Sequence, residues 1–151
     1  MKFLANLGFD GRVFLRDEEG IAMTEALIAV PFLAFLAVAV LEFGSLFWQR
    51  EQMETGLRDA ARYMARCRQA TDCDTIASNL AYYGNSNGSG ALRVPNWNAA
   101  NAPITFSNPS GVGGTVSATS THTLANSPLF GWLGIDAIVI TVNNNQRRIG
   151  W

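Results

Sequence analysis

Charged residues are scarce over much of this 151-residue sequence. Between Thr75 and Ile135 the only ionisable side chains are Arg93, His122 and two tyrosines. The net charge of the whole chain is −1, so no nucleic-acid partner is expected. The tract is instead rich in Asn, Ser, Thr, Gly and Ala, a composition that suits either an exported β-rich domain or a partly disordered segment.

Motifs for catalysis and metal binding are also missing. His122 is the single histidine and there is no CxxC motif, so no metal site is expected. The cluster Gly111-Val112-Gly113-Gly114 lacks the lysine and the helix of a phosphate-binding loop and is interpreted as a turn. Ser120, His122 and Asp136 could be drawn as a triad, but no nucleophile elbow surrounds the serine. The sequence therefore predicts a protein that is not an enzyme and that has no cofactor.

The two cysteines, Cys67 and Cys73, are separated by five residues. In a small exported domain, a single pair at this spacing predicts a disulfide that closes a short loop. The alternative is a pair of free thiols in a cytoplasmic domain.

One long apolar run lies near the N-terminus. Residues 26–41 carry no charge, Glu42 interrupts the run, and apolar residues then resume as far as Trp48. As a helix, the 23 residues from Ala26 to Trp48 would be roughly 34 Å long, enough to cross a hydrocarbon core of about 30 Å. Pro31 is expected to kink or loosen this helix locally.

A charged segment precedes the apolar run and ends at Gly20, and Glu25 follows five residues later. A carboxylate inside the bilayer costs about 2.5–3.5 kcal/mol on insertion scales, so it needs a partner or a purpose. A prepilin has this arrangement: a removable leader, a new N-terminal amine, and a carboxylate that can meet the amine of a neighbouring subunit. An uncleaved signal anchor would account for the apolar run but would not predict Gly20 and Glu25.

Beyond Trp48 the helix is predicted to continue, because apolar residues recur at spacings of three and four and so share one helical face. These residues are Met53, Leu57, Ala60, Met64 and Cys67. The stripe can pack on the protein's own globular domain, or it can also line a bundle of helices from several subunits. Glu54 and Arg58 form an i,i+4 pair in the favoured order, whereas Gly56 is expected to weaken the helix by about 1 kcal/mol relative to Ala.

The rest of the sequence predicts one short helix and a small antiparallel sheet. The helix is expected over 76–83, after N-cap candidates in 71–75, and it ends at Gly84. A long loop follows to Pro103. Strands are expected over 104–106, over 116–124 as an exposed strand, and over 137–142, with a helical turn from Ser127 to Leu133 between the last two.

The expected fold class is α+β, a long N-terminal helix with a small antiparallel sheet. We divide the chain into a cytoplasmic leader at 1–20, a transmembrane and stalk helix at 21–66, and a small domain at 67–151.

From Gly20 to Ala65 the sequence resembles the TadE-like minor pilins and pseudopilins of tight-adherence (Flp/Tad) pili. The matching features begin with the glycine-bounded leader and with Thr24-Glu25-Ala26 and Pro31. They continue with Leu41-Glu42-Phe43-Gly44, Phe47, Gln49-Arg50, Gln52-Met53 and the run from Leu57 to Tyr63. The end of the chain, near Arg148-Ile149-Gly150, is a weaker match. Ala26 is a departure from the main Flp-type pilins, which usually have an aromatic residue after the glutamate.

The resemblance implies a pilin-like fold and a structural role in pilus assembly. It implies cleavage between Gly20 and Ile21 by a prepilin peptidase, after which Glu25 of one subunit pairs with the Ile21 amine of another. The implied partners are that peptidase, other pilin and minor pilin subunits, and the inner-membrane pilus assembly platform. The alternative is an uncleaved, single-pass adhesin or binding domain.

The expected location is the bacterial inner membrane, with the C-terminal domain in the periplasm. The cysteine pair and the tract rich in Ser, Thr and Asn favour this direction. The count of arginines does not, because more of them follow the span than precede it, and the positive-inside rule would place the C-terminal side in the cytoplasm.

Overall fold

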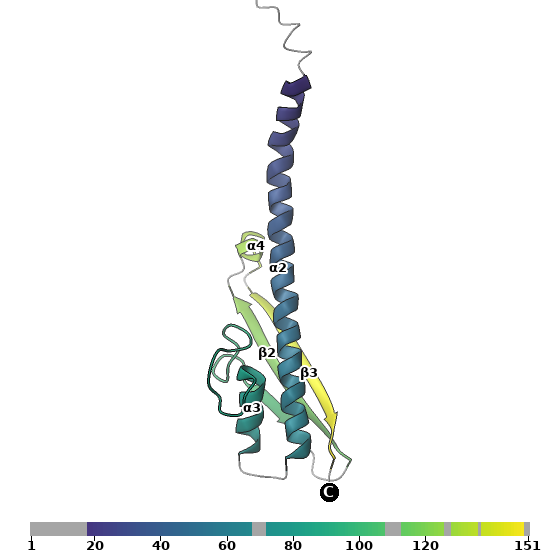
Figure 1. Cartoon of the computed structure of the whole chain (residues 1–151), viewed down its shortest axis with the longest axis vertical. Helices are drawn as coiled ribbons and strands as arrows, with labels where there is room; N and C mark the ends of the chain where they lie inside the picture. The colour runs from purple at the N-terminus through teal and green to yellow at the C-terminus, as the bar shows by residue number, and fades with distance from the viewer. Residues whose placement is uncertain (1–17, 68–71, 108–112, 126–127, 136, 150–151) are drawn as a thin grey trace, which may run out of the picture. The chain divides into compact units, whose positions relative to one another are not determined.

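The computed structural model describes residues 18–67, 72–107, 113–125, 128–135 and 137–149. Its elements, in order, are α2 (Glu18–Arg66), α3 (Cys73–Tyr83), β1 (Ile104–Ser107), β2 (Thr115–Ala125), α4 (Pro128–Trp132) and β3 (Ala137–Arg147) (Figure 1). The chain divides into two compact units between Val40 and Leu41, within α2. The α+β class is confirmed, as a long N-terminal helix followed by a three-stranded antiparallel sheet, which is consistent with a pilin-like fold.

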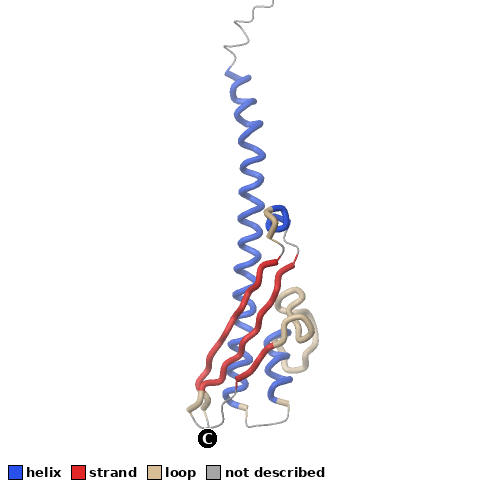
Figure 2. The backbone as a smooth tube through the Cα atoms, turned by 180° about the vertical axis from the view of Figure 1, so that it is seen from behind, coloured by secondary structure: helices blue, strands red, loops and turns tan. Residues whose placement is uncertain are grey.

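The sheet has the strand order β1-β2-β3, and β2 lies in the middle (Figure 2). Both pairs are antiparallel, with Ile104 opposite Ser120 and Thr115 opposite Arg147. Side chains alternate between the faces of a strand, and the inward residues of β2 are buried: Val116, Ala118, Ser120 and His122. The prediction of an exposed strand is therefore wrong for this face, whose small and polar residues conceal the usual apolar alternation.

The other elements match their predictions except at the boundaries. Helix α3 begins at Cys73, three residues earlier than expected, and Asp72 occupies its N-cap position without a capping side-chain hydrogen bond. It ends as predicted, with Gly84 in the left-handed region (φ 75°) and its N–H donating to the carbonyl of Leu80. Strand β3 continues to Arg147, because its polar C-terminal half pairs with β2 through the backbone.

The C-terminal half of α2 packs on the protein's own domain. Of the five residues predicted to form one stripe, four are at most 2% exposed and belong to the main core, and the fifth, Cys67, is partly buried against it. The four are Met53, Leu57, Ala60 and Met64. They offer no surface to another subunit, so the alternative of a shared helical bundle is wrong for this stripe. On the exposed side of the helix, the predicted pair of Arg58 with Glu54 is present, with 3.4 Å between the two charged groups.

At Gly56 the backbones of α2 and α3 lie very close together. A Cβ atom at this position would lie 2.6 Å from the carbonyl oxygen of Ala81 and 3.0 Å from Cη2 of Trp97. The sequence identifies Gly56 only as a weak position in a helix. The structure shows that its missing side chain lets α3 and the indole ring pack directly against the α2 backbone.

Trp97, from the long loop between α3 and β1, is fully buried. Its Nε1–H donates to the hydroxyl oxygen of Ser120 (3.0 Å), and that hydroxyl donates in turn to the carbonyl of Ala102 (3.2 Å). The ring of Tyr82 meets the indole edge to face at 5.1 Å, and burial raises the pKa of Tyr82 to about 12. The loop thus completes the core between the helices and the sheet.

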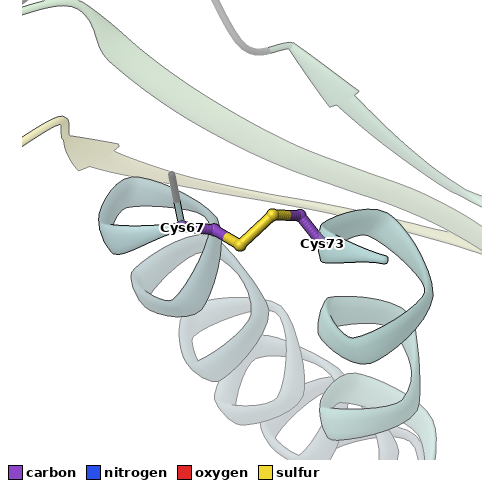
Figure 3. The surroundings of a disulfide bond; sticks show 2 residues. All are labelled: Cys67 and Cys73. Atoms are coloured by element: carbon purple, nitrogen blue, oxygen red, sulfur yellow. A yellow bond between two sulfur atoms is a disulfide. The ribbon is translucent and has the colours of Figure 1, made fainter. Parts of the chain in front are cut away.

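A disulfide joins Cys67, which follows the last residue of α2, to Cys73, the first residue of α3 (Figure 3). Their Cα atoms are 6.2 Å apart, within the usual range for a bridge. The bond therefore ties the start of α3 to the end of α2. A second connection to α2 comes from the loop after α3, where Arg93 donates to the carboxylate of Asp59 at 2.9 Å.

Candidate functional site

The N-terminal part of α2 carries the candidate membrane anchor. Among the described residues there is one helix long and apolar enough to cross a membrane, and its most apolar stretch has a mean hydropathy of 2.5. None of that stretch is buried within the protein, as it would be in the core helix of a soluble domain. The helix continues through Pro31. A nonpolar surrounding such as lipid would accommodate these exposed side chains.

The predicted processing site lies in the first turns of this helix. Because α2 begins at Glu18, the peptide bond between Gly20 and Ile21 is within the first helical turn. A Cβ atom added at Gly20 would meet nothing within 4 Å, so no packing requires a glycine there. The hydroxyl of Thr24 donates to the carbonyl of Ile21, the residue after the predicted cleavage site, at 2.8 Å.

Glu25 is exposed one turn after Ile21, and the spacing of four places both on the same helical face. Glu42 lies further along and is half-buried. In the part of the chain that the structure describes, neither carboxylate has a hydrogen bond or an ion pair. Each would therefore have to find a partner outside its own chain, or water, if it lay within a membrane.

Of the three residues of the rejected triad, Ser120 has a structural role. The hydroxyl of Ser120 is engaged between Trp97 and Ala102, and Asp136 lies outside the described residues. His122 lines an open cavity of about 640 Å³ together with polar residues that include Asn101. Burial lowers the pKa of His122, which favours the neutral ring. Over the described ranges, no three His, Cys, Asp or Glu side chains gather where they could hold a metal ion.

The family comparison points to the same N-terminal segment. The model of the family described as TadE-like protein matches residues 20–62, under a third of the chain. The resemblance seen in the sequence is confirmed over these residues, and it associates the chain with the pilin-like proteins of the tight-adherence pilus. This family is structural rather than enzymatic. No curated protein and no solved structure matches the chain.

The predicted site residues thus fall into two groups. Gly20, Ile21 and Glu25 lie within two turns of one helix, where the family match begins. Cys67 and Cys73 are bonded to each other in the globular part. The sequence alone gave no role to the apolar residues at the end of α4 and just after it. Three large ones fall within four positions there and are exposed: Trp132, Leu133 and Ile135.

Proposed function

We propose that this chain is a minor pilin or pseudopilin that helps to assemble a tight-adherence pilus. The observation that carries the proposal is the position of the TadE-like match, which begins at Gly20 and includes the exposed apolar part of α2. In this proposal a prepilin peptidase removes residues 1–20, and the mature subunit begins with Ile21. The partners are other pilin subunits and the inner-membrane assembly platform.

Glu25 is the residue that sets the register between subunits in this proposal. An α-amine has a pKa near 8, so the new terminus of Ile21 is mostly cationic at neutral pH. Two unit charges 4 Å apart attract by about 4 kcal/mol at an effective dielectric of 20, against about 1 kcal/mol in water. That attraction is comparable to the cost of placing a carboxylate in the bilayer, about 2.5–3.5 kcal/mol. Pairing with another subunit therefore favours both insertion and register.

Processing is tested by expressing the full chain with and without the prepilin peptidase and measuring its mass. We expect the peptidase to remove residues 1–20. Gly20→Ala should slow cleavage, because Ala stabilises the first helical turn and adds a side chain at the cleaved bond. Gly44→Ala is the matched control: it is another exposed glycine of α2 whose added Cβ meets nothing within 4 Å. An unchanged mass with the peptidase present would contradict the proposal and favour the uncleaved anchor.

Register is tested with the cleaved protein in piliated cells. We expect Glu25→Gln, which keeps the shape and removes the charge, to be cleaved normally but to impair pilus assembly. Glu51→Gln provides the control, since Glu51 is an exposed carboxylate of α2 beyond the apolar run. Normal piliation in the Glu25 variant would remove the register role while leaving the processing result intact.

The proposed orientation places the globular domain in the periplasm. The bond between Cys67 and Cys73 supports it, because disulfides persist in oxidising compartments. Alkylation of free thiols in intact cells should show these cysteines oxidised in a normal strain and reduced in one that lacks its periplasmic thiol oxidant. Reduced cysteines in both strains would instead place the domain in the cytoplasm, as the arginine count predicts.

A further inference from the structure

Helix α4 is fixed against α2 at a point inside the apolar run. The rings of Phe130 and Phe43 meet edge to face, with centroids 5.5 Å apart, and α4 lies beside α2 in Figure 1. Leu129 and Phe130 are both buried. In the turn after α4, Gly134 adopts the left-handed conformation, and the N–H of Ile135 donates to the carbonyl of Phe130 at 2.8 Å. The residues around this turn are therefore held in place by backbone hydrogen bonds.

The same turn exposes large apolar side chains. Trp132 is 73% exposed, Leu133 52% and Ile135 44%. A single exposed apolar residue is ordinary, but three within four positions on an ordered turn form a patch, and such patches mark contact with a partner or a membrane. Residues 128–135 carry no charged side chain. The patch therefore has nothing with which to select a charged ligand.

The depth of this patch along α2 can be worked out from the sequence. Phe43 is five residues before Trp48, where the apolar run ends, and five residues of helix rise by about 7.5 Å. Interfacial helices bury their apolar faces about 5–10 Å into the boundary between headgroups and acyl chains. Since the ring of Phe130 in α4 contacts Phe43, α4 itself lies near that depth when the run spans a bilayer.

We propose that Trp132, Leu133 and Ile135 insert into the membrane interface and form a second anchor beside the transmembrane helix. The inference rests on the proposed membrane span of α2, but not on its direction, on leader cleavage or on pilus assembly. Lipid is favoured over a second copy of the chain because α4, which carries the patch, packs on Phe43 of the apolar run, and both Phe43 and Phe47 are themselves exposed. Trp is also enriched at membrane interfaces.

The inference is tested by attaching a nitroxide label to Leu133→Cys in the full chain, with the native disulfide oxidised, in phosphatidylcholine vesicles. Collisions with oxygen report lipid, and collisions with a water-soluble nickel chelate report water. Two further labels serve as references: Leu36→Cys within the apolar run, and Asn145→Cys on an exposed position of β3. We expect chelate collisions at Leu133 to be severalfold fewer than at Asn145, in low and in high salt.

Three results would overturn the inference, and they differ from one another. A Leu133 label as accessible to chelate as Asn145, with Leu36 still in lipid, would leave the span intact and remove the second anchor. A Leu36 label in water would remove the span itself and the anchor with it. Shielding of Leu133 from both reagents, with spin–spin broadening, would show that a second copy covers the patch. Ile135→Cys repeats the test in case the first variant misfolds.

Discussion

Replacing Gly56 with Ala tests whether the close contact between α2 and α3 holds the domain together. The new Cβ would lie 2.6 Å from the backbone oxygen of Ala81, which can move only if α3 moves. Its other neighbour, Trp97, is held by the hydroxyl of Ser120. Overpacking of this kind destabilises by about 1–3 kcal/mol, against a gain of about 1 kcal/mol from the higher helix propensity of Ala.

The matched variant is Gly44→Ala, in the same helix but with open space around the added Cβ. Both substitutions gain helix propensity, so the difference between their free energies of unfolding isolates the steric clash. We expect Gly56→Ala to be less stable than Gly44→Ala by about 1–3 kcal/mol.

Denaturant unfolding of the full chain in detergent micelles measures this difference, with near-ultraviolet circular dichroism reporting the packed aromatic rings. Equal midpoints for the two variants, with the aromatic signal unchanged, would refute the reasoning. Such a result would mean that α3 and Trp97 can withdraw from α2 at no cost.

Three further outcomes are expected in the same unfolding assay. Ser120→Ala leaves the buried N–H of Trp97 without its acceptor and should destabilise the domain by about 1–3 kcal/mol. Thr121→Ala, on the exposed face of the same strand, should have a much smaller effect. Similar losses of stability in the two variants would contradict this role of the Ser120 hydroxyl. Cys67→Ser opens the short disulfide loop and should lower stability by roughly 2 kcal/mol, and a reductant should then have no further effect. Burial lowers the pKa of His122 below 6.5, so the unfolded chain binds a proton first as the pH falls. Stability should therefore be full above about pH 6.5 and decline below it until the folded ring is protonated, and His122→Gln should remove this part of the pH dependence.

The sequence predicted elements whose signals are local. The stripe from Met53 to Met64 and the left-handed end of α3 at Gly84 follow from helical spacing and from glycine chemistry, and both are confirmed. The burial of β2 could not be predicted, because Ala118 and Ser120 are buried only through segments distant in the sequence, such as the loop whose Trp97 bonds to Ser120. Neither the role of Gly56 nor the place of α4 has a local signal, since each depends on a segment distant in the sequence.

The residues of the candidate site were predictable for a different reason. The arrangement of Gly20 and Glu25 was recognisable because processing and subunit pairing depend on short-range spacing, and the family match begins at that glycine. The predicted partner of Glu25 belongs to a second chain. The cleavage and pairing roles of these residues remain predictions for the experiments proposed above.

The long loop between α3 and β1 has one more practical consequence. Its middle is fixed by the buried Trp97 and by the backbone bond from Arg93 to Tyr82. Residues 89–91 are nevertheless exposed, and a Cβ at Gly90 would meet nothing within 4 Å. Each doubling of loop length adds only about 0.6 kcal/mol of closure entropy. A short epitope placed after Gly90 should therefore leave the fold intact, and antibody–gold labelling of such a strain would locate the subunit at the base, the shaft or the tip of a filament.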